Sequence, residues 1–383
     1  MLKSLKISGF RKYRELCLKD LGRVNCILGQ NNVGKTTILE AIYTWACGQN
    51  LIPLFNMPMA RGRYVGIQQP YWMMEELLSL FNDSRTLPLK MTLDGVSNGK
   101  RACFEHTVYP SDILTEYDSS YKRFPEGLMF RNNEILQRTS QAPAPAPVLL
   151  GTMQIVPDAF AKWEIAHDGS DAQVYEITTP ILQTSRKRSF YHATFIDVLG
   201  QIAIAENVQI YSCLKRENLL DEVVKEMRHV FPEISGFDMI PYPDATQAPV
   251  SVVQDNGRML PLYVYGDGVQ RWFYIFGVVV LYKNSIICID EIDVGFHPTA
   301  QVEFCTNLIL AAKKNNVQLF LTTHNLEFID NFLKATKNID DKDASDIKII
   351  TLRRQESAEG PASRTLDALE AREARDEFAL ELR

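Results

Sequence analysis

The sequence predicts an α/β fold in which a parallel β-sheet is combined with an antiparallel β-subdomain and a helical lobe. Three short apolar runs support this prediction: residues 24–28, 285–289 and 317–321. Each run leads into polar residues, and polar residues at the carboxyl ends of parallel strands form the ligand sites of open α/β sheets. Since far more chain separates the first two runs than one crossover needs, we expect a large insertion between them.

The first run continues into the loop GQNNVGKT, residues 29–36, and then into a helical pattern. A strand, this loop and a helix in this order are typical of a P-loop. Gly29 and Gly34 allow backbone N–H groups to curl around phosphate oxygens, and Lys35 reaches the β and γ phosphates. Thr36 offers its hydroxyl to Mg²⁺, and the lack of a downstream NKxD motif, which reads guanine, favours ATP. The expected nucleotide contacts are Gly29, Asn31, Asn32, Gly34, Lys35, Thr36 and Thr37.

The second run, Ser285–Ile289, ends in Asp290 and Glu291, as a Walker B strand does. Two carboxylates at this place have separate tasks. We expect Asp290 to hold Mg²⁺ through its shell of water and Glu291 to polarise the water that attacks the γ-phosphate. A solvent-exposed acidic strand end is the alternative, but four apolar residues run directly into this pair. The pattern therefore predicts ATP hydrolysis.

The third run ends in TTHN, which places His324 just after a strand. A lone histidine is usually a core residue with satisfied hydrogen bonds. Because this strand is of the buried, parallel type, its carboxyl end lies where ligands bind. We therefore favour a contact between His324 and the γ-phosphate, with a catalytic role.

The inserted chain carries signals of β-hairpins. Residues 87–110 alternate in hydrophobicity and contain the turn pairs Asp94-Gly95 and Asn98-Gly99. A second alternating stretch, residues 148–181, turns around His167-Asp168-Gly169. We expect these hairpins to form the antiparallel β-subdomain.

Other parts of the insertion predict a linker and helices. The repeat APAPAP at residues 142–147 is typical of a stiff extended linker, and helical patterning runs from about Tyr191 to Val230. The predicted organisation is an ATPase core in two parts, 1–58 and 246–352, a β-rich insertion, 59–185, a helical lobe, 186–245, and a C-terminal helical tail, 353–383.

The composition is that of a globular protein, with 46% hydrophobic and 23% charged residues. The longest apolar run, Trp272–Tyr282, is shorter than the roughly 20 residues of a membrane span, and the N-terminus lacks a signal-peptide core. Seven cysteines without a CxxC pair fit a reducing compartment, so we expect a cytoplasmic protein. The net charge of −6 does not indicate a broadly basic nucleic-acid surface, although the patch at residues 186–188 leaves phosphate contacts open.

Several segments carry a family resemblance: ISGFRKYRE, GQNNVGKTT, LLDEVVKEMRHVFPEI, YGDGVQR, IICIDEIDVGFHP, FLTTHNLEFID and the terminal EFALELR. Together they resemble the ABC-type ATPases of the RecF, SMC and OLD group. The most similar members are stand-alone bacterial ATP-binding proteins, many of which belong to anti-phage systems. The resemblance covers both ends of the chain and leaves residues 50–185 without a match. It implies an ABC-type P-loop head that forms homo-oligomers through ATP-sandwich dimers.

In this family a signature turn before the Walker B strand closes over the γ-phosphate that a second chain binds. Gly266, Asp267 and Gly268 occupy that place, so the resemblance implies that they contact the partner's nucleotide. We also expect a helix from Gly268 to Lys283 with Asp267 as its cap. Because Gly266 replaces the usual serine, Arg271 is a candidate substitute donor to the phosphate. Arg11 and Lys12 match, loosely, a nucleotide-contacting position, and no glutamine loop is assigned.

The function that we favour is an ATP-dependent switch. Two chains sandwich ATP and control a separately encoded effector in anti-phage defence. The main alternative is a RecF- or SMC-like ATPase that repairs or organises DNA, which should show a basic face or long arms. The engine of a membrane transporter is a third hypothesis.

A fourth hypothesis is a nuclease fused to the ATPase, as in OLD proteins, where a TOPRIM domain follows. Only 59 residues follow His324, and they predict one strand, Asp346–Leu352, and a charged helix that ends at Arg383. A complete TOPRIM domain does not fit in this length. We therefore expect the effector, a TOPRIM-like or other nuclease, to be another chain.

Overall fold

The computed structural model describes residues 1–50, 79–82, 88–110, 161–168, 170–177, 189–197, 204–239, 249–254, 256–353 and 362–378. The predicted linker at 142–147 and the basic patch at 186–188 lie outside these residues, as do the predicted boundaries at 58 and 185.

A six-stranded core sheet carries the motifs, as the α/β prediction requires. The strand order is β15-β14-β3-β13-β12-β8, and all neighbours are parallel except β15, which is antiparallel to β14. The strands are β3 (Val24–Gly29), β8 (Ala193–Ile196), β12 (Ile286–Ile289), β13 (Gln318–Thr322), β14 (Ile347–Arg353) and β15 (Ala362–Asp367). The carboxyl ends of β3, β12 and β13 therefore meet at one edge of the sheet.

A second six-stranded sheet is antiparallel, in the order β2-β1-β4-β5-β6-β7. Its strands are β1 (Leu2–Phe10), β2 (Tyr13–Leu18), β4 (Leu89–Ser97), β5 (Lys100–Pro110), β6 (Ala161–His167) and β7 (Ser170–Ile177). The first predicted hairpin, β4 and β5, is confirmed, and its β4 pairs with β1 of the N-terminal hairpin. The second is confirmed as β6 and β7, with β6 paired to β5, while residues 148–160, 169 and 178–181 of its predicted range lie outside the described residues. One sheet thus combines the predicted insertion with the first part of the predicted core.

The turn pairs of the first hairpin have different outcomes. Asn98 and Gly99 form the turn, with φ of +50° and +73°, as the sequence predicts. The prediction of a turn at Asp94-Gly95 is wrong, because both residues lie inside β4. A Cβ at Gly95 would come within 2.5 Å of the Trp45 ring, so this glycine permits close packing rather than a turn.

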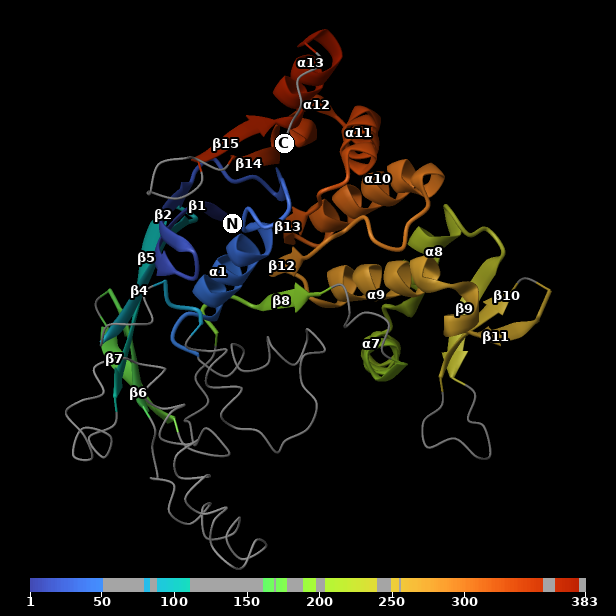
Figure 1. The fold of residues 1–383 in the computed structure, drawn as a ribbon. Helices are drawn as coiled ribbons and strands as arrows, with labels where there is room; N and C mark the ends of the chain where they lie inside the picture. The colour runs from blue at the N-terminus through green and yellow to red at the C-terminus, as the bar shows by residue number, and fades with distance from the viewer. Residues whose placement is uncertain are drawn as a thin grey trace, which may run out of the picture.

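Helix α1 (Lys35–Cys47) lies between the two large sheets (Figure 1). Its buried side chains join β1 and β4 to one face of the core sheet in a single hydrophobic cluster. Trp45 is fully buried there, and its indole N–H donates to the Ala102 carbonyl at 3.0 Å. The helix that begins at the P-loop is therefore fixed on both sides, which holds the loop in place.

The other face of the core sheet is covered by helices. They are α7 (Ile204–Arg216), α8 (Leu220–Arg228), α9 (Asp267–Leu281), α10 (Pro298–Lys314), α11 (Leu326–Ala335), α12 (Asp341–Ser345) and α13 (Ala368–Phe378), with the 3₁₀ helices η2 (Leu262–Tyr265) and η3 (Thr336–Asn338). A three-stranded sheet, β11-β10-β9, lies beside α8 and α9 (Figure 1). Its strands are β9 (Ile234–Met239), β10 (Val250–Gln254) and β11 (Met259–Pro261). No helix in these described ranges is long and apolar enough to cross a membrane.

Two expectations about secondary structure are corrected. The helical pattern predicted from Tyr191 is interrupted by β8, a four-residue edge strand that pairs with β12. So short a strand has too few residues to show its own periodicity. The predicted helical tail contains β15, whose side chains are mostly half-buried because it pairs at the outer edge with β14. The predicted boundary at 245 and 246 lies outside the described residues, in the segment of sequence between β9 and β10, which pair with each other.

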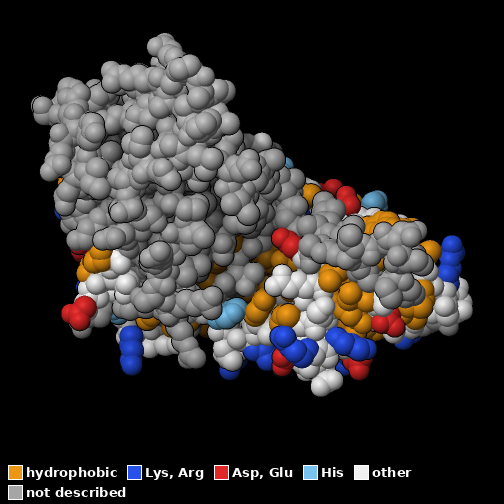
Figure 2. Space-filling model, turned by 90° about the horizontal axis from the view of Figure 1, so that it is seen from below, with side chains coloured by type: hydrophobic (Ala, Val, Ile, Leu, Met, Phe, Trp, Pro, Cys, Tyr) orange, Lys and Arg blue, Asp and Glu red, His pale blue; other side chains and the backbone are white. Residues whose placement is uncertain are grey.

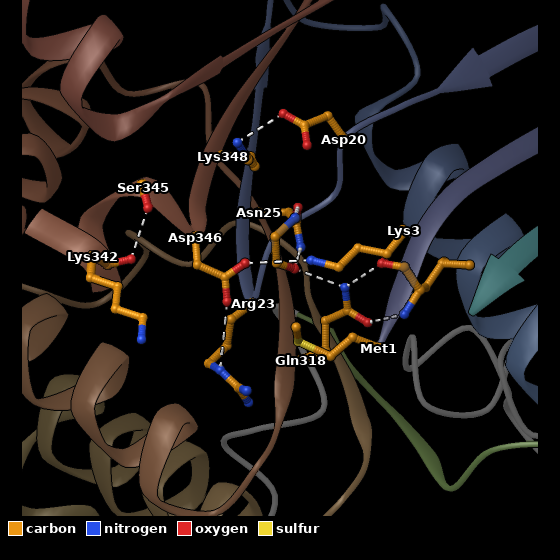
Figure 3. A network of polar contacts seen from close by, with 12 residues as sticks. Met1, Lys3, Asp20, Arg23, Asn25, Gln318, Lys342, Ser345, Asp346 and Lys348 are labelled. Carbon is orange, nitrogen blue, oxygen red and sulfur yellow. Dashed lines mark hydrogen bonds and ion pairs between the residues drawn. The ribbon is translucent and has the colours of Figure 1, made fainter. Parts of the chain in front are cut away.

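Polar side chains tie the amino edge of the core sheet together (Figure 3). The buried Gln318 amide accepts from Leu2 N–H and donates to the carbonyls of Leu2 and Gly22, each at 2.8 Å. Asn25 donates to the Gly22 carbonyl at 2.8 Å. Because buried amides need such partners, this network fixes β1 against the starts of β3 and β13, at the edge away from the motifs.

The surface seen from below is chemically mixed (Figure 2). On the described part of this face, Lys and Arg side chains lie close to Asp and Glu side chains, and hydrophobic side chains gather beside them. Ion pairs such as Lys314 with Glu222, 2.6 Å apart, illustrate how the two signs of charge are combined on the surface.

Candidate functional site

The loop after β3 has a backbone that only glycine suits at two positions. Gly29 has φ of +152° and Gly34, the N-cap of α1, has φ of +109°. A Cβ at Gly34 would come within 2.2 Å of the Tyr13 hydroxyl, and one at Gly29 within 2.9 Å of the Leu352 carbonyl. The predicted strand, loop and helix are all present, and close packing of the loop explains its glycines.

Lys35 begins α1 and is largely buried. Its ammonium donates to the carbonyls of Gly29 at 2.8 Å and Gln30 at 3.0 Å, so the side chain folds back along the loop. Burial lowers the pKa of Lys35, and the nearby carboxylates, Asp290 first among them, oppose this shift. Asn31 and Asn32 are exposed on the loop.

The structure brings Thr36 and Asp290 together across 254 positions of sequence. The Thr36 hydroxyl donates to both carboxylate oxygens of Asp290, at 2.9 and 3.1 Å. Asp290 is buried and also accepts from Thr322 at 2.5 Å. A hydroxyl and a carboxylate are the oxygen donors that Mg²⁺ accepts, so the pair fits a magnesium site. No group of three or more His, Cys, Asp or Glu side chains in the described ranges forms another candidate metal site.

Glu291 and His324 lie next to each other at the same edge. His324 Nδ1 is 3.8 Å from a Glu291 carboxylate oxygen, and the two side chains are 43% and 40% exposed. Both groups therefore reach solvent beside the buried Asp290. The predicted Walker A, Walker B and histidine elements converge as parallel strands with these endings should.

The signature turn, residues 266–268, lies at the start of α9. Gly266 has φ of +86° and is the N-cap of the helix, whereas Asp267 is its first residue. The prediction that Asp267 caps α9 is wrong, because no side-chain hydrogen bond caps this helix. Asp267 is instead exposed. A Cβ at Gly268 would come within 2.6 Å of the Gly295 carbonyl, so this residue packs against the loop after β12.

The turn is separate from its own chain's P-loop. Within the described ranges, no hydrogen bond or ion pair joins residues 266–268 to residues 29–37. Gly266 and Asp267 are exposed, and a Cβ at Gly266 would meet nothing within 4 Å. The turn thus presents an open surface.

Arg271 does not take the place that the sequence predicts. Its guanidinium is buried and donates to the carbonyls of Asp290 at 3.2 Å and Glu291 at 2.5 Å, in its own chain. It is therefore not a substitute phosphate donor at the exposed turn. Burial lowers the pKa of Arg271 to about 10, while Asp293 and its acidic neighbours oppose the shift. At neutral pH the group stays charged.

Arg11 and Lys12 are held near the P-loop by their own chain. Arg11 forms an ion pair with the buried Glu40 of α1, with Nη2 3.0 Å from Oε1. The Lys12 ammonium donates to the Asn32 carbonyl. These contacts stabilise the loop and the first turns of the helix that follows it.

Sequence reasoning missed several residues at this edge. Thr322 contacts the Asp290 carboxylate and accepts from the Glu291 N–H at 2.9 Å, and Thr323 donates to Asp293 at 2.6 Å. Asp197 follows β8, directly beside Asp290, whose N–H donates to the Ile196 carbonyl at 2.9 Å. One signal was available, since β8 and β12 both end in an isoleucine that is followed by an aspartate.

Known protein families match the two segments of the chain that contribute residues to this site. The family described as "AAA ATPase domain" matches residues 1–47, and the one described as "AAA domain, putative AbiEii toxin, Type IV TA system" matches residues 176–330. The first contains the P-loop, and the second contains the signature turn, Asp290, Glu291 and His324. Both segments of the chain are thus similar to AAA ATPase domains, as expected for an ATPase.

Individual relatives of this ATPase are distant. An "ATP/GTP phosphatase" of Helicobacter pylori is 24% identical over 347 residues, which cover 86% of this chain and 87% of that protein. The "DNA replication and repair protein RecF" of Clostridioides difficile is 45% identical over 49 residues, 13% of each chain. Among solved structures, the SMC head domain from Thermotoga maritima aligns over 96% of this chain and 98% of its own, with 12% identity and a TM-score of 0.42.

Proposed function

We propose that this ATPase is Mg²⁺-dependent, dimerises around ATP, and acts as a sensor or switch that controls a separately encoded effector in bacterial anti-phage defence. The observation that carries the catalytic part is the contact between Thr36 and Asp290, with Glu291 and His324 beside it. These groups come from three strand ends that close on one point, where the terminal phosphate would lie.

Each residue has a proposed role at this point. Lys35 turns from the loop carbonyls to the β and γ phosphates, which replace them as partners for its charge. Thr36 and Asp290 hold Mg²⁺, which supplies positive charge to the phosphate oxygens when bound. Glu291 accepts a proton from the attacking water, and His324 donates to the γ-phosphate. The half-exposed position of both side chains suits contact with an incoming substrate.

The open signature turn supports the dimer. Gly266 and Asp267 are exposed, and the N-terminus of the 15-residue α9 favours an anion. Since no hydrogen bond or ion pair joins the turn to the P-loop of its own chain in the described ranges, a second copy of the chain is the proposed source of the phosphate. Two copies related by a twofold axis would then form two equal composite sites.

A mixing experiment tests the composite site. Gly268 is a poor target, since its packing on Gly295 means that a side chain there would disturb its own chain. Asp267→Tyr places a bulky ring on the exposed turn instead, and we expect it to spare ATP binding and block turnover. Mixed with Lys35→Ala chains, it should regain part of the parent ATPase activity, because one composite site is intact. Asp267→Asn, of equal size, is the control.

Two results would argue against the shared site. One is a mixture that is no more active than either variant alone, although mixed dimers are demonstrated by differently tagged chains. The other is an Asp267→Tyr protein that hydrolyses ATP at the parent rate. Either result would indicate that the turn only begins helix α9 and does not contact a partner's nucleotide.

The proposed defence role is supported by the description "putative AbiEii toxin, Type IV TA system" of the family that matches residues 176–330. The product of the neighbouring gene is the first candidate effector. We expect co-expression of the two proteins to protect cells from phage in plaque assays, and Lys35→Ala to abolish this protection. Equal protection with Lys35→Ala would contradict ATP control of the effector.

The RecF-like alternative is favoured by the match of 49 residues to RecF. A DNA-repair ATPase should bind DNA with an affinity that falls steeply as salt increases. Stimulation of ATP hydrolysis by DNA, measured at several salt concentrations, would favour this alternative over the switch.

A further inference from the structure

The backbone at Glu291 has a conformation that its neighbours must hold. Glu291 has φ of +46°, in the left-handed region that is unfavourable for a residue with a Cβ. Such a conformation persists where surrounding contacts fix it. It sets the direction of the Glu291 carboxylate, which lies 3.8 Å from His324.

Two buried side chains hold this peptide segment from different elements. Thr322 of β13 accepts from the Glu291 N–H at 2.9 Å and donates to the Asp290 carboxylate at 2.5 Å. Arg271 of α9 donates to the carbonyls of Asp290 at 3.2 Å and Glu291 at 2.5 Å. Thr322 is fully buried and Arg271 is 4% exposed, so water does not compete for these bonds. We call Thr322 and Arg271 the Glu291 clamp.

We propose that the Glu291 clamp positions the catalytic carboxylate and that Arg271 links it to the signature turn. Arg271 lies four residues after Asp267, one helical turn along α9. A shift of the turn when it meets a partner's phosphate therefore moves the guanidinium that holds the Glu291 carbonyl. This inference rests on the proposed role of Glu291. Arg271 and Thr322 are argued to act through Glu291, since their hydrogen bonds go to Asp290 and Glu291, so both are positioning residues.

A purely structural role is the competing explanation. Arg271 also lies over the Phe296 ring, 6.0 Å from its centroid, and could serve only to fill the space beneath the turn. In that case its replacement should lower stability without a specific effect through Glu291. The two explanations predict different kcat values when a variant of Arg271 or Thr322 is combined with a substitution of Glu291.

The single variants are Thr322→Val, which keeps the shape and removes the hydroxyl, and Arg271→Lys, which keeps the charge but is shorter and lacks the Nη2 atom that makes both bonds. We expect kcat to fall by about 10- to 100-fold, as for the loss of a buried hydrogen bond, with the Kd for ATP unchanged within about threefold. Thr322→Ser should recover most of the rate. Thr336→Val, at another fully buried threonine, is the matched control. Melting temperatures check the fold of each variant.

The decisive experiment measures kcat for two double variants, in which Thr322→Val or Arg271→Lys is combined with Glu291→Gln. If the clamp acts through Glu291, the second change should alter the residual rate by less than about threefold, because coupled residues are not additive. The clamp would be overturned if the fold-losses in kcat of the single variants multiplied in the double variants. It would also be overturned if Thr322→Val and Arg271→Lys both had the kcat of the parent. A Glu291→Gln protein that hydrolyses ATP at the parent rate would instead overturn the proposed function. The half-saturating Mg²⁺ concentration should stay unchanged in Arg271→Lys, which leaves the Asp290 carboxylate bonds intact.

Discussion

Replacing Lys35 with alanine is expected to abolish detectable ATP binding and hydrolysis. The ammonium is the group proposed to meet the β and γ phosphates, and in the structure it already spans the loop to the carbonyls of Gly29 and Gln30. Two charge-assisted hydrogen bonds contribute about 1.5–3 kcal/mol each, which corresponds to roughly 10²- to 10⁴-fold in affinity. Equilibrium binding of labelled ATP to the purified variant measures this loss.

A matched lysine at the opposite edge of the same sheet provides the control. Lys348 is also largely buried and forms an ion pair with Asp20 at 2.8 Å (Figure 3). Lys348→Ala should bind ATP like the parent, because its ammonium lies at the amino ends of the strands. If Lys35→Ala bound ATP as tightly as Lys348→Ala, the placement of the phosphate site would be wrong.

Replacing Glu291 with glutamine is expected to keep ATP bound and to slow its cleavage. The amide preserves the size of the side chain but cannot accept a proton from the attacking water. General base catalysis contributes about 10²- to 10⁴-fold, so kcat should fall by that factor. Single-turnover hydrolysis of labelled ATP measures the chemical step, and a binding assay measures retention of ATP.

The same variant should trap the closed state. Since cleavage opens the proposed dimer, slow cleavage should cause an ATP-dependent dimer to accumulate, visible by light scattering at the elution peak. Glu303→Gln, at an exposed position of α10, is the control and should remain like the parent. Hydrolysis by Glu291→Gln at the rate of Glu303→Gln would contradict the assignment of the catalytic carboxylate.

The sequence predicted much of the core fold and of the candidate site because these parts are encoded locally. A buried strand followed by a fixed loop pattern shows itself in consecutive residues, as at Gly29–Thr36. Asp290 and His324 also follow buried apolar runs. Because parallel strands align their carboxyl ends, the sequence alone predicts that these two residues lie near the P-loop. The structure adds the measured contact between Thr36 and Asp290.

Elements at the edges were harder to predict. β8 has four residues and β15 is mostly half-buried, so neither carries a strong pattern, and both exist because a longer strand pairs with them. Gly95 resembled a turn signal, yet it serves the packing of Trp45 against β4. In each case a tertiary neighbour outweighed the local signal.

By itself, the sequence determined that this chain has a P-loop, an acidic strand end and a histidine on a parallel sheet, because each is a short pattern with its own chemistry. Only the tertiary structure decided where Arg271 and Thr322 direct their hydrogen bonds. Both could have faced solvent, a phosphate or the core, and the choice depends on which strand and helix lie next to Glu291. Contacts between distant segments are set by packing of the whole sheet and its helices, which no local pattern records.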